Sequence, residues 1–318
     1  SLDLIPLIIP EAYGWMGLEQ DSVSNALALE ALAYGDLSLS MSVSVPLLVA
    51  QIISEHGSEE QKGELLPKLV NGSIFHVGLG INNSLLSTDP YQSDVTAEEN
   101  GKEIILNGSK TGIAFANQAN TFLISASNES GECNLYFVNK DQEGVTLEDK
   151  DFMGLKGAPL SQINLSNCKI NASQKLGGHN YSINYEAFVD SSRIGMSALA
   201  LGVCQAVLDY VVPYTNERVA FDEPISNRQS VAFMVADMAI ETEALRLMIY
   251  KSAALKDLGE DFHKQASLTY RFAAHHAMKI GTDGVQLLGG HGFTHEHPVE
   301  LWYRNLRAIG IFEGGAGV

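Results

Sequence analysis

The spacing of apolar residues divides the chain into three regions, the first of which is helical. Apolar residues from Ala26 to Ala33 recur at helical spacing. The segment Ser58–Gln61 has the composition of a capping box, in which a serine and a glutamine satisfy each other's backbone N–H groups. A second helix is therefore expected to begin there. The pattern predicts an N-terminal helical domain over residues 1–72.

The second region has a shorter apolar period. From about residue 74 to residue 170, runs such as EIILNG, TFLISAS and NLYFVN are separated by Asn, Gly, Asp and Ser. Short alternating runs between turn residues are typical of β-strands. We therefore expect a middle β domain, a barrel or a sandwich, over residues 73–178.

Long helical patterns return in the third region. They start near Arg193, Gln229 and His263, and each is long enough to cross a helical bundle. Helices of this length bury their apolar faces against one another, so an antiparallel bundle is expected over residues 179–318. The whole pattern predicts an α+β protein with an N-terminal helical domain, a middle β domain and a C-terminal helical bundle.

Charge and cysteine content narrow the function. The formal net charge of −18 argues against a nucleic-acid-binding surface, which needs clustered Lys and Arg. The three cysteines are widely spaced and odd in number, which favours a reducing, cytoplasmic setting over a disulfide framework. The apolar stretch Leu37–Ile53 contains serines, a proline and a glutamine, so it is interpreted as a buried helix and not a membrane span.

The segment IFEGGAGV, residues 311–318, places one carboxylate between an aromatic residue and several glycines. Glycine has no Cβ and tolerates positive φ, so such a turn lets the backbone approach a ligand closely. Two interpretations follow from these eight residues. Glu313 is either a solvated acid in an exposed turn or an acid that faces a ligand.

Five longer phrases carry a family resemblance. In chain order they are IPEAYGWMG, HGSEEQKGELLPKLVNG, LNGSKTGI, ERVAFDEPISNRQSVAFMVADMA and VQLLGGHGFTHEHPVELWYRNLRAIGIFEGG. Together they resemble the acyl-CoA dehydrogenase family of flavoproteins over almost the whole chain. The resemblance implies that the family's N-terminal domain begins before residue 1 and that a helical tail follows IFEGGAGV.

The resemblance also implies an active site. Glu313 matches the family's catalytic base, which removes the α-proton of an acyl-CoA thioester while the β-hydride passes to the flavin of FAD. Phe312 and Gly314 are expected at the substrate, and Arg193 is a candidate for the CoA phosphates. Some family members carry the base just before this arginine, where this chain has Ser192. Glu313 therefore has no rival for the role.

Cofactor contacts and partners follow from the same matches. Arg218 and Phe221 correspond to residues that contact the FAD of a neighbouring subunit, so a homodimer or homotetramer is implied. An electron-transfer flavoprotein or a similar acceptor is the implied redox partner, in the cytoplasm or, in a eukaryote, in the mitochondrial matrix. The complete set of expected FAD contacts is Ser84, Arg218, Phe221, Gln229, Gln286, Gly289 and Gly290.

The β domain departs from the family near the flavin ring. A family phrase of the type Thr-Glu-Pro-Gly-Ala-Gly-Ser-Asp corresponds to the segment from Gly78, of which Ser84 alone is retained. The family's Trp-Ile-Thr is replaced by Gly112, Ile113 and Ala114. The chain is thus either an FAD-dependent acyl-CoA dehydrogenase or a flavin-free paralogue that serves as a partner subunit or binds acyl thioesters.

Two further possibilities carry less weight. A flavin monooxygenase on the same fold would not need the acid at Glu313. The segment HGFTHEHPVE contains metal-binding residue types, but its spacing fits no zinc signature, so no metal is expected. The acyl chain length is not specified by the sequence.

Overall fold

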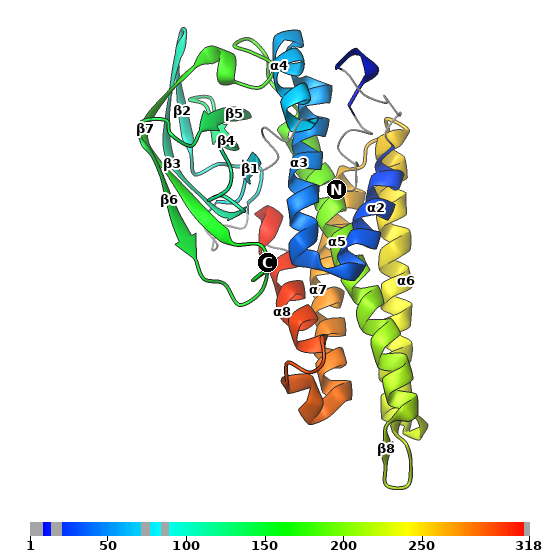
Figure 1. Ribbon diagram of the computed structural model, residues 1–318. Coiled ribbons are helices and arrows are strands. Elements are labelled where there is room, and N and C mark those ends of the chain that lie inside the picture. The colour runs from blue at the N-terminus through cyan, green and yellow to red at the C-terminus, as the bar shows by residue number, and fades with distance from the viewer. Residues whose placement is uncertain (1–8, 14–20, 71–76, 84–88, 315–318) are drawn as a thin grey trace.

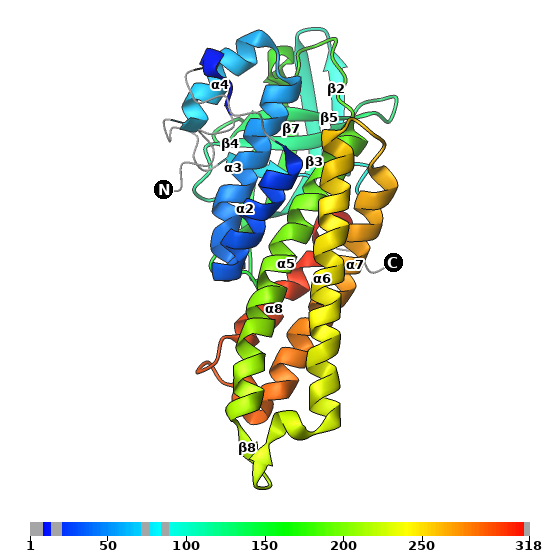
Figure 2. The same cartoon turned by 90° about the vertical axis from the view of Figure 1, so that its right-hand side faces the viewer.

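The computed structural model describes residues 9–13, 21–70, 77–83 and 89–314. Three helices precede a curled β-sheet, and a bundle of long helices follows it (Figures 1 and 2). The sheet lies beside the upper half of the bundle, and the short turn η5 (Phe312–Gly314) lies between them. This arrangement is the predicted α+β organisation.

The first helices begin at aspartate or serine caps. After the short turn η1 (Glu11–Tyr13), they are α2 (Ser22–Gly35), α3 (Leu37–His56) and α4 (Glu59–Val70). The Asp21 and Asp36 side chains accept hydrogen bonds from the first turns of α2 and α3. Ser58 and Gln61 bond each other's backbone N–H groups at 3.1 and 3.2 Å, which confirms the predicted capping box.

The middle region forms one seven-stranded sheet. Its order is β1-β4-β2-β3-β7-β6, with β5 paired to β4, so the predicted barrel or sandwich is a single sheet that curls. The strands are β1 (Val77–Gly80), β2 (Thr96–Asn100), β3 (Glu103–Ala114), β4 (Thr121–Ser127), β5 (Cys133–Asn139), β6 (Val145–Lys150) and β7 (Leu160–Asn171). A one-turn helix, η2 (Ala172–Gln174), leads out of the sheet.

Strand β3 carries an irregularity that shapes the site. Its pairing with β7 shifts register between Lys110 and Ile113, as a β-bulge does. Gly112 lies in this bulge with φ of +69°, a backbone conformation that L side chains rarely adopt. The replacement of the family's tryptophan by glycine therefore matches the local backbone.

The described part of the C-terminal bundle, residues 179–314, contains four α-helices. They are α5 (Tyr185–Glu217), α6 (Gln229–Asp257), α7 (His263–Leu288) and α8 (Val299–Ile309). Helix α5 begins eight residues before the apolar pattern at Arg193, where Asn184 accepts a hydrogen bond from the backbone N–H of Ala187. The remaining elements are β8 (Val219–Ala220), β9 (Glu223–Pro224), η3 (Ile225–Asn227) and η4 (Gly289–Phe293).

A hairpin forms the far tip of the bundle (Figure 1). Strands β8 and β9 are joined by Phe221 and Asp222, whose φ angles are +57° and +68°. Two consecutive positive φ angles are typical of the tightest two-residue hairpin turns. Asp222 suits the second position, because aspartate is one of the non-glycine residues that tolerate this conformation best.

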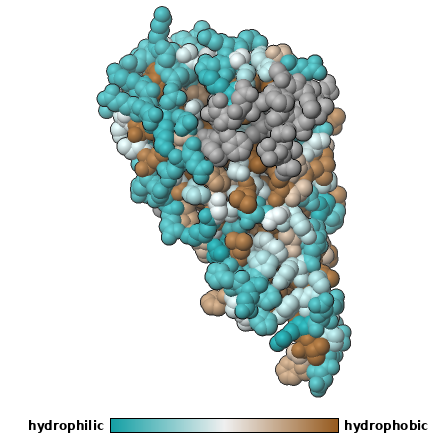
Figure 3. Space-filling model, in the orientation of Figure 1, coloured by the Kyte–Doolittle hydropathy of each residue, from teal (hydrophilic) through white to brown (hydrophobic). Residues whose placement is uncertain are grey.

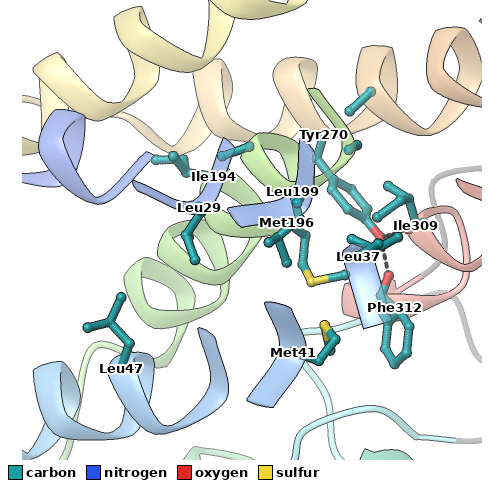
Figure 4. Packing of buried hydrophobic residues seen from close by; sticks show 14 of the residues in the cluster. Leu29, Leu37, Met41, Leu47, Ile194, Met196, Leu199, Tyr270, Ile309 and Phe312 are labelled. Carbon is teal, nitrogen blue, oxygen red and sulfur yellow. Dashed lines mark hydrogen bonds between the residues drawn. The ribbon is translucent and has the colours of Figure 1, made fainter. Parts of the chain in front are cut away.

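The main core lies between the helices and the facing side of the sheet. Figure 4 shows Leu29, Met41, Met196 and Leu199 packed between α2, α3 and α5. By length and composition, α3 and α5 could each cross a membrane, but 56% and 72% of their most apolar windows are buried in this fold. Buried core helices meet the same criteria.

All three cysteines are free and buried. Cys133 and Cys168 lie in the sheet, and Cys204 lies in α5. Burial raises the pKa of the Cys168 thiol to about 11 and also raises the pKa of the other two. The thiols are therefore kept in the protonated, unreactive form.

Candidate active site

Glu313 is a buried acid in a strained turn. It lies in η5 with φ of +49° and ψ of +36°, and its side chain is almost fully buried. A left-handed conformation at a residue other than glycine persists only where the surroundings hold it. The interpretation of Glu313 as a solvated acid in an exposed turn is therefore wrong.

Three segments hold the Glu313 backbone in place. Its N–H donates to Asn82 Oδ1 at 2.8 Å, and its carbonyl oxygen accepts from Arg193 Nη2 at 3.0 Å and Nε at 3.3 Å. Next to it, the buried Tyr270 hydroxyl lies within hydrogen-bond reach of the Phe312 carbonyl, as Figure 4 shows. The β1 end, α5 and α7 thus meet at this turn.

The Glu313 carboxylate has one bound and one unbound oxygen. Ser192 Oγ donates to Oε1 at 2.8 Å, whereas Oε2 is buried and has no hydrogen-bond partner within the described part of the chain. Burial raises the pKa of Glu313, and the Ser192 hydrogen bond and the Arg193 charge oppose that rise. An unpaired buried oxygen is costly and indicates a position for a ligand.

Glu313 lines an apolar cavity. The cavity has about 910 Å³ of empty volume between α2, α3, α5, the sheet and η5. Its walls are formed mainly by side chains such as Leu29, Met41, Leu48, Ile194 and Leu199. An elongated apolar group could lie here with its polar end at Glu313.

A second apolar cavity lies on the other side of Phe312. It has about 640 Å³ of empty volume, and Asn82, Gly112 and Phe312 line both cavities. A Cβ at Gly112 would lie 3.1 Å from a ring carbon of Phe312 and 3.7 Å from Asn82 Nδ2. The glycine therefore leaves this shared wall of the two cavities without a side chain.

Arg193 is engaged within the protein. Its side chain is only 9% exposed, and besides the Glu313 carbonyl it donates to Tyr91 Oη at 2.9 Å and Ser267 Oγ at 3.1 Å. The guanidinium also lies over the Tyr91 and Tyr270 rings, at 5.4 and 5.3 Å from their centroids. These contacts favour a role in holding Glu313, while a role in phosphate binding stays a prediction.

The expected cofactor residues lie far from Glu313. Arg218 and Phe221 are in or beside the tip hairpin, and Gln229 begins α6 next to it. Gln286, Gly289 and Gly290 lie where α7 passes into η4, again toward the lower end of the bundle in Figure 1. Ser84 lies outside the described residues.

The histidine-rich segment forms aromatic contacts. His291 Nδ1 and His297 Nδ1 lie 3.0 and 2.7 Å from the hydroxyls of Tyr214 and Tyr210. Among the described residues, the group with metal-ligand spacing is instead Glu186, Asp190 and His263. No local sequence pattern indicated that group.

Two residues of the site were missed by sequence reasoning. Asn82 lies in a stretch that retains only Ser84 of the family phrase, and Tyr270 lies on the apolar face of α7. A buried tyrosine needs a partner for its hydroxyl, which was the one available signal for Tyr270. Asn82 had no such signal.

Comparison with known proteins identifies the family. Residues 1–73, 85–168 and 184–318 match the N-terminal, middle and C-terminal domains of acyl-CoA dehydrogenases. A probable acyl-CoA dehydrogenase of Mycobacterium tuberculosis is 34% identical over 314 residues, which cover 96% of this chain and 80% of that protein.

Solved structures support the same family assignment. Butyryl-CoA dehydrogenase from Megasphaera elsdenii superposes with a TM-score of 0.88 at 30% identity, covering 99% of this chain and 85% of that one. A glutaryl-CoA dehydrogenase from Mycobacterium smegmatis in complex with FADH2 has a TM-score of 0.85 at 28% identity, covering 96% and 78%. The chain therefore belongs to the acyl-CoA dehydrogenase family of oxidoreductases.

Proposed function

We propose that the chain is an FAD-dependent acyl-CoA dehydrogenase in which Glu313 is the catalytic base. Glu313 takes the α-proton of an acyl-CoA thioester, the β-hydrogen leaves as a hydride, and a trans-2-enoyl-CoA is formed. The observation that carries the proposal is the unpaired, buried Oε2 of Glu313 at an apolar cavity. FAD, when bound, supplies the acceptor for the hydride.

The surroundings of Glu313 suit proton abstraction. A thioester α-proton is weakly acidic, so the base must be held within hydrogen-bond reach and must have a raised pKa. Burial raises the pKa of Glu313, and the backbone contacts from Asn82 and Arg193 fix its position. The apolar walls of the cavity exclude water from the acyl chain.

The second cavity is the candidate site for the flavin ring. Its walls are mostly apolar, as those of small-molecule sites are. Gly112, whose positive φ and contact with Phe312 leave no room for a side chain, presents bare backbone there. Asn82, Gly112 and Phe312 are the residues that would hold the ring, because they line both the second cavity and the cavity of Glu313.

The proposal includes a homodimer or homotetramer. The tip hairpin with Arg218 and Phe221 lies at the opposite end of the bundle from the sheet, so it would contact FAD bound by another protomer. Phe221 is 86% exposed, and the Arg228 guanidinium stacks over its ring at 4.9 Å from the centroid. An exposed, oriented aromatic side chain suits a contact with a planar ligand.

Helix α6 supports the same assembly. Phe233, Ile240 and Leu247 follow one another at seven-residue intervals along α6, and each is more than half exposed. Figure 2 shows α6 at the front of the bundle, and Figure 3 shows that apolar residues also reach the surface along the helices below the sheet. Exposed apolar stripes of this kind are typical of subunit interfaces.

The remaining partners are part of the same proposal. Electrons would pass from reduced FAD to an electron-transfer flavoprotein or a similar acceptor. A reducing compartment, the cytoplasm or the mitochondrial matrix, fits the three free cysteines.

The first test is a visible absorption spectrum of the purified protein, followed by anaerobic addition of an acyl-CoA series. We expect a flavin band that bleaches with acyl-CoA of a preferred chain length. A protein that stays colourless after incubation with FAD would contradict the proposal and favour the flavin-free partner subunit. Product formation that depends on oxygen would instead favour a monooxygenase.

Ser192→Ala is expected to shift the acidic limb of the kcat/KM profile to higher pH. The serine hydroxyl stabilises the ionised form of Glu313, so its loss raises the pKa of the base further. Activity that requires ionised Glu313 then appears only at higher pH. The control is Ser191→Ala, because Ser191 Oγ bonds the Ala187 carbonyl and not the acid. If the acidic limb of the kcat/KM profile of Ser192→Ala stays at the wild-type pH, the Ser192 hydroxyl does not set the pKa of the base.

A further inference from the structure

Three side chains, those of Asp190, Tyr91 and Arg193, connect the partly exposed His263 to the backbone of Glu313. His263 Nδ1 lies 2.8 Å from Asp190 Oδ2, and Tyr91 Oη donates to Asp190 Oδ1 at 3.1 Å. Arg193 Nη1 donates to Tyr91 Oη at 2.9 Å, and the same guanidinium holds the Glu313 carbonyl. The chain of contacts joins α7, α5, the loop before β2 and η5.

The two charged groups that follow His263 in this series, Asp190 and Arg193, are buried. The His263 side chain is 41% exposed, whereas that of Asp190 is 1% exposed and Arg193 is also buried. Charges in such surroundings interact strongly because little water screens them. A change of charge at His263 therefore alters the electrostatic interactions of Asp190 with Tyr91 and Arg193.

The charges around His263 are mostly acidic. Asp190 and Glu186 face it from α5, Asp261 precedes it in the turn before α7, and the buried cation is Arg193. The hydrogen bond with Asp190 raises the pKa of His263, while burial raises the pKa of Asp190 and His263 opposes that rise. The ion pair between protonated His263 and Asp190 is therefore fully formed at pH values below the ordinary histidine pKa. It is lost as the pH rises through the raised pKa of His263.

Tyr91 is the link between the ionic pair and the arginine. Burial raises the pKa of Tyr91 to about 12, so its hydroxyl stays protonated and can donate to Asp190 while it accepts from Arg193. The centroid of its ring also lies 5.7 Å from that of the His263 ring and 5.4 Å from the guanidinium carbon of Arg193.

The spacing of Glu186, Asp190 and His263 suits a hydrogen bond between His263 and Asp190 better than a shared metal ion. The donor atoms of Glu186, Asp190 and His263 lie within 4.8 Å of one another. However, two ligands about 2 Å from a tetrahedral zinc are about 3.3 Å apart, which exceeds the 2.8 Å between His263 and Asp190. The Arg193 charge, which acts on Asp190, would also repel a cation.

We propose that His263, Asp190 and Tyr91 are positioning residues that couple the protonation of His263 to Glu313 through Arg193. When His263 loses its proton, the Asp190 carboxylate keeps the Tyr91 hydrogen bond, and Arg193 is the cation that still acts on it. The guanidinium is drawn toward Asp190, and its two hydrogen bonds to the Glu313 carbonyl weaken. The proposal rests on the proposed function in one respect, which is that Glu313 is the base whose position matters.

The direct test is carboxyl NMR of protein labelled with ¹³Cδ-glutamate, titrated between about pH 5 and pH 9. The Glu313 signal is identified by its loss in Glu313→Gln. We expect this signal to show a second inflection at the pH where the His263 ring itself titrates. Tyr91→Phe, which retains the ring over Arg193, and His263→Gln, which changes a partly exposed side chain, are both expected to remove that inflection.

His275→Gln is the matched control, since His275 is exposed on the same helix and lies outside the chain of contacts. The control should retain the second inflection. An inflection of Glu313 that is unchanged in both Tyr91→Phe and His263→Gln would overturn the proposal. If the second inflection of the wild type disappears on addition of EDTA and returns with Zn²⁺, the proposal is wrong and these residues form a metal site.

Kinetics separate this proposal from the proposed function. With an acyl-CoA that the protein oxidises, kcat/KM of the wild type should fall at least about fivefold as pH rises through the His263 pKa, a typical size for coupling between sites. Tyr91→Phe and His263→Gln should lack this falling limb. If no acyl-CoA is oxidised, the proposed function fails, while the NMR titration still tests the coupling.

Discussion

Glu313→Gln is expected to lower acyl-CoA oxidation by a factor of about 10² to 10⁴, the usual contribution of a positioned general base. Glutamine has nearly the same shape and can still accept the Ser192 hydrogen bond, but it cannot take a proton from the thioester. The backbone contacts to Asn82 and Arg193 do not depend on the side chain. Flavin binding should therefore be retained, and the loss should appear in the rate of flavin bleaching by acyl-CoA.

The control for this variant is Glu296→Gln, an exposed acid in the C-terminal segment. It removes the same charge without touching the cavity and should leave the rate unchanged. Near-normal bleaching in Glu313→Gln would exclude Glu313 as the base. Loss of flavin together with activity would indicate a structural role for the carboxylate.

Gly202→Ala is expected to destabilise the protein by about 1–3 kcal/mol or more, as overpacking does. A Cβ at Gly202 in α5 would lie 2.2 Å from the Glu30 carbonyl oxygen and 2.8 Å from the Tyr34 nitrogen in α2. These are backbone atoms, so one whole helix must shift to make room. The free energy of unfolding, measured by urea denaturation, reports the loss.

Gly195→Ala is the matched control in the same helix and against the same neighbour. Its Cβ would meet only Leu29 Cδ1, at an ordinary 3.4 Å. Alanine is favoured over glycine in a helix by up to about 1 kcal/mol, so this variant should be as stable as the wild type or more so. Equal destabilisation by the two substitutions would mean that close approach of α2 and α5 at Gly202 does not limit stability.

The helices could be predicted well because their signals are local. The capping pair Ser58 and Gln61 lies within one turn, and it starts α4 as expected. The sequence predicts the start of α5 only at Arg193, eight residues after its true start, because the residues before Arg193 have no clear apolar period. The curl of the sheet was not predictable either, because it depends on β4 pairing with β1, β2 and β5 together.

The site was only partly predictable for a similar reason. The sequence indicated an acid beside glycines, but three of the residues that hold Glu313 lie far away along the chain. Asn82, Ser192 and Arg193 are separated from it by 231, 121 and 120 positions. Pairing of this kind leaves no periodic pattern, so the contacts and the positive φ emerge only in the folded chain.

The buried cysteines have a practical consequence for observing how the protein opens. A thiol reagent attacks the thiolate, so protonated and enclosed thiols react only while their surroundings are transiently exposed. Cys168 lies in the sheet and Cys204 in the bundle, and the two are chemically identical reporters of separate layers. Their relative rates of alkylation under native conditions would therefore show whether the sheet loosens before the helices or the molecule opens as one unit.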